Sequence, residues 1–228
     1  MSVALGDVVF DAAHTAVRER YEEVGGRAER AVEISGLIVG EPSVAAIHSR
    51  LDAILEAASA EDYSAPLTLR PGRILLVRRA EFLRQVVEET LTGSFTLKLA
   101  AQSPFEESTA VHGFEWNIAG SGAQLALASN GNAPALAVVA LFAVGDVVNP
   151  AVSDGEHTIT YFGTVEDGSE LLLDGRAGRA TLDGADVTPY TSGQFARIAP
   201  EGSTLEYTDG TASSHTANAI VEFRDRWW

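Results

Sequence analysis

The sequence predicts a mainly β protein of two domains. From Val111 onward, short apolar runs are separated by turn dipeptides at intervals of about ten residues, as in antiparallel sheets, and alternating runs also occur in the first half. One stretch, 42–58, has instead the three- and four-residue apolar spacing of a helix that packs on a sheet. The chain has 228 residues, of which 46% are hydrophobic and 21% charged, so it can build two modest cores. We expect a β-barrel or β-sandwich with one packed helix over residues 1–105, and a jelly-roll type β-sandwich over 106–228.

The first forty residues predict strands at 7–10, at 18–23 and in an alternating run that ends at Gly40, with Gly36 as a candidate bulge. The helix follows, with Pro42 near its first turn and Glu41 or Ser43 at its N-cap. Its apolar stripe consists of Ile47, Leu51, Ile54, Leu55 and Ala58. Burial of such side chains contributes on the order of 1.5–3 kcal/mol each, so this face is expected to lie on a sheet.

Strands resume around a turn at Pro71-Gly72, and Phe95, Leu97 and Leu99 then alternate with polar residues. The segment 103–107 has no apolar period and is predicted to be a linker, within a seam at 102–109. Beyond residue 111 we expect no helix. Asp-Gly turns at Asp167, Asp174, Asp183 and Asp209 punctuate the second half.

The charge of the chain disfavours attraction to nucleic acid. The formal net charge is −16, from 32 acidic and 16 basic residues, and it is divided unevenly between the halves. Residues 1–105 carry 11 basic and 15 acidic side chains (net −4), whereas residues 106–228 carry 5 and 17 (net −12). Phosphate neutralisation needs clustered Lys and Arg, yet Lys98 is the only lysine.

The chain has no Cys, which excludes disulfides, thiolate metal sites and cysteine nucleophiles. No apolar run approaches the roughly 18–20 residues of a membrane span, and the first residues do not resemble a secretory signal. We therefore expect a protein that folds in the cytoplasm and does not bind membranes.

No motif for catalysis, cofactor binding or metal binding is found. The five histidines, at 14, 48, 112, 157 and 215, form neither an HExxH motif nor a close pair. Ser121 lies in GSGA, which lacks the spacing of a nucleophile elbow. The Asp-Gly steps are explained by hairpin turns better than by calcium loops. The sequence thus predicts a protein without enzymatic activity, cofactor or metal, and a jelly-roll hydrolase is the least favoured class.

Several stretches in both halves of the chain resemble the distal tail proteins of long-tailed (siphovirus-type) phages and of gene transfer agents. In the first half these are SGLIVGEPSVAAIHSRLDAILEAAS, PLTLRPGRILLVRR and LTGSFTLKLAAQSPFEES, in which Ser103-Pro104-Phe105 is the DPF-like junction of the family. In the second half SNGNAPALAVVALFAVGDVVNPAV, HTITYFGTVEDGSELLLDGRAGRATLDG and SGQFARIAPEGSTLEYTDG are similar to the GNAP stretch, the hairpins and the closing strands of that family. Phe195 replaces the more usual Trp, and Glu201-Gly202-Ser203 replaces a Pro-Gly-Asn turn.

The resemblance implies an N-terminal domain that closes into a ring, commonly a hexamer, at the end of the tail tube, followed by a galectin-like sandwich. Its partners would be further copies of itself, the tail tube protein, the tape-measure protein and the tail-tip or baseplate hub. It implies a location at the tail tip of the virion, after assembly in the bacterial cytoplasm. DNA would pass through the lumen without specific binding, past an acidic or neutral wall.

Two sets of residues are predicted to make contacts between chains. The alternating charges of one run suit pairing between subunits: Arg18, Arg20, Glu22, Glu23, Arg27, Glu29 and Arg30. At the C-terminus, Trp227 and Trp228 either close the end of their own sandwich or dock onto the neighbouring domain or a tail partner. The alternative function is a carbohydrate-binding, lectin-like module, in which Trp116, Trp227 and Trp228 would stack on sugar rings.

Overall fold

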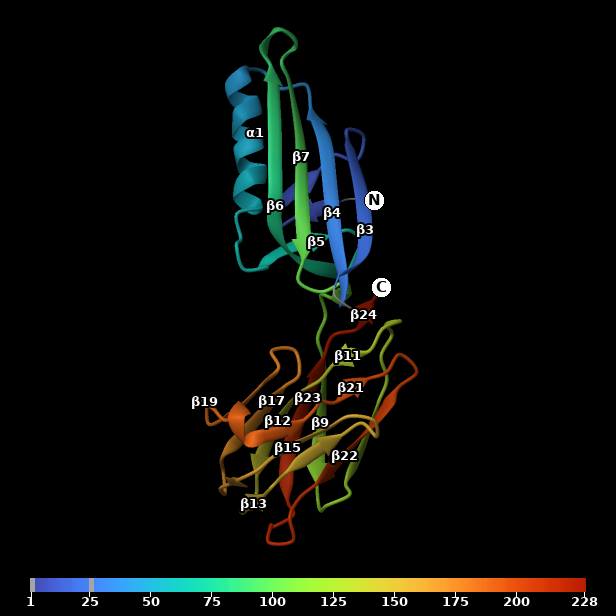
Figure 1. The fold of residues 1–228 in the computed structure, drawn as a ribbon, viewed down its shortest axis with the longest axis vertical. Coiled ribbons are helices and arrows are strands. Elements are labelled where there is room, and N and C mark those ends of the chain that lie inside the picture. The colour runs from blue at the N-terminus through green and yellow to red at the C-terminus, as the bar shows by residue number, and fades with distance from the viewer. Residues whose placement is uncertain (1–2, 25–26) are drawn as a thin grey trace. The chain divides into compact units, whose positions relative to one another are not determined.

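The computed structural model describes residues 3–24 and 27–228 and divides the chain into two compact units (Figure 1). The first unit comprises residues 1–109 with Trp228, and the second comprises 110–227. The division therefore falls at Thr109, a little after the boundary placed at residue 105 from the sequence. The reason is that segment 103–107 is not a free linker: its last residues form a strand of the first unit.

The first unit is an antiparallel sheet with one helix. Its path order is β2-β1-β5-β6-β7-β4-β3, and β8 pairs with the start of β6. Figure 1 shows α1 alongside β6 and β7. The elements are β1 (Val3–Leu5), β2 (Val8–Phe10), β3 (Thr15–Val24), β4 (Arg27–Ile38), α1 (Val44–Ala57), β5 (Ala65–Thr68), β6 (Arg73–Val87), the 3-10 turn η1 (Glu88–Thr90), β7 (Thr92–Ala101) and β8 (Glu106–Ser108).

The predicted helix is confirmed. Ser43 is its N-cap and accepts a hydrogen bond from the backbone N–H of Ala46 at 3.2 Å. Ile47, Leu51 and Ile54 are buried against the sheet, as the apolar period predicts. Because strand side chains alternate, the opposite face of β3, β4, β7 and β6 carries the polar residues of these strands.

Gly36 is not a bulge, since β4 keeps an unbroken register with both neighbours. A Cβ at Gly36 would lie 2.6 Å from the ring of Phe95, so glycine is needed there to admit that ring. The register shift of this sheet occurs in β6 instead, between Arg79 and Glu81.

The second unit is an antiparallel β-sandwich. A five-stranded sheet (β10-β22-β14-β15-β20) and a six-stranded sheet (β19-β18-β17-β12-β23-β9) contribute side chains to one shared core, with the short pairs β11-β21 and β13-β16 beside them. The elements are β9 (His112–Ile118), β10 (Gln124–Leu127), β11 (Ala135–Leu136), β12 (Val138–Ala143), β13 (Val147–Val148), β14 (Ala151–Ser153), β15 (Thr158–Tyr161), β16 (Thr164–Val165), β17 (Glu170–Asp174), β18 (Arg179–Leu182), β19 (Ala185–Asp186), the 3-10 turn η2 (Thr188–Tyr190), β20 (Thr191–Gly193), β21 (Arg197–Ile198), β22 (Ser203–Thr208), β23 (Ala217–Phe223) and β24 (Arg226–Trp227).

The SNGNAP stretch (129–134) packs against the backbone of Arg226, in β24. The backbone N–H groups of Asn132 and Ala133 donate to the carbonyl oxygen of Arg226 at 2.9 and 3.1 Å. A Cβ at Gly131 would lie 2.2 Å from the same oxygen, so only glycine fits there. The close packing of two backbone segments in the second unit therefore explains why this motif has a glycine at position 131.

Candidate assembly surface

The charged run predicted for pairing between subunits lies on β3 and the start of β4. In the antiparallel register, Arg18 is opposite Glu33, Glu22 is opposite Glu29, and Arg20 is opposite Ala31. Because directly opposed residues of two strands share a face, these side chains lie on the polar face of the sheet. Arg18, Arg20, Glu22, Glu23 and Glu29 are exposed, whereas the side chain of Arg27 lies outside the described part of the chain.

A row of alternating charge crosses this face. Arg18 on β3, Glu33 on β4, Lys98 on β7 and Glu81 on β6 occupy successive positions across the four strands. The Nζ atom of Lys98 lies 2.5 Å from a carboxylate oxygen of Glu81. The hydrogen bond from Lys98 to Glu81 and the charges of Glu81 and Glu33 raise the pKa of Lys98. An open groove of about 670 Å³ lies over β3, β4 and Lys98.

Arg30 does not belong to the exposed surface, which corrects the prediction for this residue. Its side chain is fully buried, on the opposite face from Arg18 and Arg20. It donates to Glu106 at 2.8 Å and to the carbonyl oxygen of Pro104 at 3.1 Å, and it also pairs with Glu19. These contacts pair both terminal nitrogens of Arg30 within its own chain, and its side chain is buried, so it cannot present its charge to another subunit.

Glu19, Arg30, Glu106 and Arg70 form a closed ring of alternating charge, which we call the Arg30 clasp. Arg70 pairs with Glu106 and also contacts Glu19 at 3.2 Å, and Nη1 of Arg73 lies 3.8 Å from Glu106. Burial raises the pKa of Glu19, but the hydrogen bonds and charges of Arg30 and Arg70 outweigh it and hold the pKa below its usual value. The clasp links Glu106 of β8 to the middle of β3 and to the first part of β4.

Tyr21, which no sequence motif indicated, packs on the Arg30 clasp. It lies directly opposite Arg30 in the register, and the Arg30 guanidinium carbon is 5.1 Å from the centre of its ring. The side chain nevertheless remains 47% exposed. The strict alternation of β3 is the sequence signal that places Tyr21 and Glu19 on the face opposite Arg18 and Arg20.

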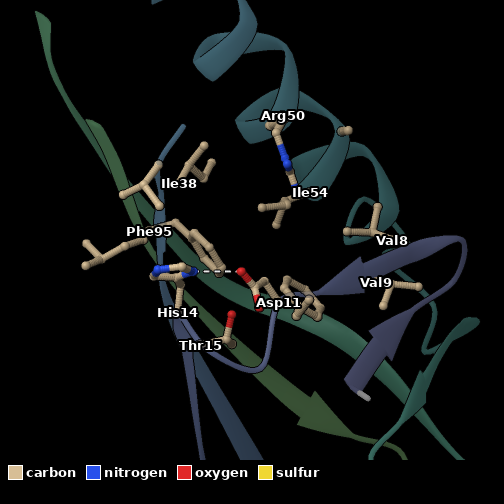
Figure 2. Close-up of a pocket in the computed structure, with 13 residues that line it drawn as sticks. Val8, Val9, Asp11, His14, Thr15, Ile38, Arg50, Ile54 and Phe95 are labelled. Carbon is tan, nitrogen blue, oxygen red and sulfur yellow. Dashed lines mark hydrogen bonds and ion pairs between the residues drawn. The ribbon is translucent and has the colours of Figure 1, made fainter. Parts of the chain in front are cut away.

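A small pocket of about 110 Å³ lies between β2, the ends of β3 and β4, and α1 (Figure 2). Its floor is apolar and includes Phe10, Ile54 and Phe95. At its rim, Asp11 accepts a hydrogen bond from His14 at 2.7 Å, which lowers the pKa of Asp11. Arg50 of α1 also lines this pocket (Figure 2). The pocket has room for about one aliphatic side chain, and its His–Asp pair is exposed.

The tryptophans do not form one sugar-binding surface. Trp116 is buried in the core of the second unit, so its predicted stacking role is wrong. Trp227 is half-buried in the second unit. Trp228 groups with the first unit, where its ring centre lies 4.3 Å from that of Phe105, and it is 54% exposed. Docking of Trp227 or Trp228 onto a tail partner stays a prediction.

Among the described residues, no group of three or more His, Asp or Glu side chains is arranged to hold a metal ion. No helix in this part of the chain is both long enough and apolar enough to cross a bilayer.

No protein-family model matches the chain, and no curated protein matches it. The fold is similar to that in the crystal structure of SPP1 Dit (gp 19.1), a distal tail protein of a siphophage described as a paradigm of the hub adsorption apparatus in phages that infect Gram-positive bacteria. The TM-score is 0.68 at 12% sequence identity, and the match covers 100% of this chain and 99% of that one. The fold therefore agrees with the resemblance to distal tail proteins that the sequence shows, and the mainly β fold class is confirmed. The galectin-like assignment of the second unit stays a prediction.

Proposed function

We propose that this chain is a structural distal tail protein of a long-tailed phage or a gene transfer agent. The observation that carries the proposal is the whole-chain likeness to SPP1 Dit, in which both units are matched in order with almost nothing left over on either side. The family motifs quoted from the sequence support the same role independently of the fold, because they extend along both units.

In this role the first unit closes into a ring, with six copies as the expected number. The ring joins the tail tube and tape-measure protein to the tail-tip hub, and DNA passes through its lumen. The exposed charges of β3 and β4 support self-association, because both signs occur side by side on a solvent-facing sheet. The chain then acts by assembly, without catalysis, cofactor or metal.

The mass of the full chain tests this role. Native mass spectrometry of the intact protein is expected to show a closed oligomer, with six copies as the principal species. The full chain is required because truncation after Ala101 would remove Glu106 and leave Arg30 buried without that partner. A protein that stays monomeric at all concentrations would contradict the ring.

The second candidate function is carbohydrate binding, which two exposed aromatic residues of the second unit favour. Phe162 and Tyr190 are 58% and 62% exposed, and the backbone N–H of Phe162 donates to the carbonyl oxygen of Tyr190 at 2.8 Å. The two residues are thus adjacent along their backbones, and exposed aromatic side chains are surfaces on which sugar rings stack. A glycan array of the full chain beside its Tyr190→Ala variant tests this role: binding by the parent that the variant loses would support it, and no binding by the parent would remove it.

A further inference from the structure

The turn between β6 and β7 presents a leucine in a strained backbone conformation. Leu91 directly follows η1 and has a φ of 48°, in the left-handed region. This region is costly for a bulky side chain, whereas glycine and asparagine adopt it readily. Leu91 also remains 38% exposed, so its own fold gives it only part of the burial that could offset this cost. Strain of this kind is found at functional sites, which suggests that the turn needs the leucine side chain for a contact.

The residues beside Leu91 are suited to insertion into another surface. Val87, just before η1, is 37% exposed, and η1 itself carries Glu88 and Glu89, which are both exposed. Neither carboxylate forms an ion pair with any residue that the structure describes. Figure 1 shows the β6–β7 turn extending past the end of α1. The turn therefore offers an apolar side chain beside two uncompensated negative charges.

The pocket between β2, α1 and the ends of β3 and β4 (Figure 2) is a complementary surface. Its volume of about 110 Å³ holds about one aliphatic side chain, and its floor is apolar. Around its mouth Val9, Leu37 and Val39 are 59%, 55% and 40% exposed. Exposed apolar residues gathered at a pocket are typical of an interaction site. Leu91 of the same chain does not line this pocket, so the chain's own turn leaves it open.

The charge at the pocket is also complementary to the turn. Arg50 lines the pocket and is 57% exposed, although its Nη1 atom lies 2.9 Å from Glu41. A guanidinium group has several N–H donors, so a carboxylate of a second chain can bind beside Glu41. Two β6–β7 turns would instead oppose four glutamates, and such like charges repel. The turn is therefore matched to the pocket rather than to its own copy.

We propose that Leu91 of one copy inserts into this pocket of the next copy, with Glu88 and Glu89 beside Arg50. The inference rests on the proposed ring and names one of the contacts that hold it together. Because the two surfaces differ, the contact joins copies head to tail and can close a ring. Both surfaces belong to the first unit, which is the unit expected to form the ring. The contact uses none of the exposed charges of β3, which keep their proposed role in self-association.

Two cysteines in one chain test the contact, because the chain has no Cys of its own. The full-length Thr90→Cys/Val9→Cys variant keeps Leu91, and a short bismaleimide is expected to link it into a ladder that ends at the size of the ring. Each single variant should give no linked species, because in a head-to-tail contact a residue does not meet its own copy. Thr90→Cys with Ser59→Cys, an exposed position just beyond α1, is the matched control. No ladder from the first pair, or an equal ladder from the control pair, would overturn the proposal.

Leu91→Asn separates the contact from the stability of the fold. Asparagine adopts the left-handed conformation readily, so the melting temperature should be no lower than that of the parent. Its amide is poorly suited to the apolar pocket, so the concentration at which the closed oligomer forms should rise about ten-fold. Leu83→Asn, at a 54% exposed leucine of β6, is the control and should assemble like the parent.

Native mass spectrometry over a dilution series measures both variants. A Leu91→Asn variant that assembles like the parent, or equal weakening by Leu83→Asn, would contradict the contact while leaving the ring in place. A parent protein that stays monomeric would instead remove the ring and this contact together.

Discussion

At the scale of single residues, the Arg30 clasp shows how a charged side chain becomes part of a core. Removing one partner of a buried ion pair costs about 3–5 kcal/mol, because the other charge is left without compensation. Glu106→Gln is therefore expected to lower the free energy of unfolding of the first unit by that amount in urea denaturation. Glu89→Gln, the same substitution at an exposed position of η1, is the control and should change little. Equal stability of the two variants would mean that the clasp does not stabilise the first unit.

Gly131 gives a second prediction at this scale. Gly131→Ala would force a methyl group to 2.2 Å from the carbonyl oxygen of Arg226, and overpacking of this kind costs about 1–3 kcal/mol. The melting temperature of the second unit should fall. Gly120→Ala is the matched control, because no atom lies within 4 Å of its new Cβ and its φ is not positive. If both variants melt alike, close packing at Gly131 is not what holds the GNAP stretch.

At the scale of elements, the β14-β15 hairpin depends on one carboxylate. Asp154 accepts the backbone N–H groups of Glu156, His157 and Arg197 at 2.7–2.8 Å. Burial raises its pKa, but these hydrogen bonds outweigh it and the pKa is lowered from its ordinary value of 3.8. The ionised form thus stabilises the fold at pH above 3.8, and this contribution is lost as the pH falls through the lowered pKa.

Asp154→Asn tests that dependence. Its amide NH₂ would face the N–H of Arg197, so the variant should be about 1–3 kcal/mol less stable than the parent at pH 7. The difference should shrink toward pH 3, because below 3.8 the carboxyl group of the unfolded parent takes up a proton and the stabilisation by the ionised form declines. Urea unfolding at both pH values measures it, and a difference independent of pH would contradict the role of the ionised carboxylate.

The elements that the sequence predicts well are those whose signal is local. Helix α1 follows from the spacing of Ile47, Leu51 and Ile54, and β7 from the alternation of Phe95 and Leu97. The errors concern residues whose environment is set from far along the chain. Arg30 meets Glu106 across a separation of 76 residues, so neither the burial of Arg30 nor the strand at Glu106 could be inferred from its neighbours. The same holds for Trp116, whose burial depends on the opposing sheet.

At the scale of the whole molecule, the net charge of −16 and the charge row on the polar face of the first unit bear on the passage of DNA that the proposed ring would require. Arg18 and Lys98 alternate with Glu33 and Glu81, so this face has no concentrated positive charge to hold phosphates. The assembled protein should bind duplex DNA with a dissociation constant weaker than about micromolar at low salt. Fluorescence anisotropy with labelled duplex measures it, and tighter binding would argue against a lumen that releases DNA.

The position of Lys98 has a practical consequence. As the only lysine, it provides the one bond that a lysine-specific endoprotease can cut, and that bond lies in β7 between β4 and β6. A protease needs several residues of extended, unpaired chain, so cleavage requires the first unit to open. The rate at which fragments 1–98 and 99–228 appear therefore measures the opening of that unit alone. Glu106→Gln should accelerate proteolysis and Gly131→Ala should not; equal acceleration by both would mean that the two units unfold as one.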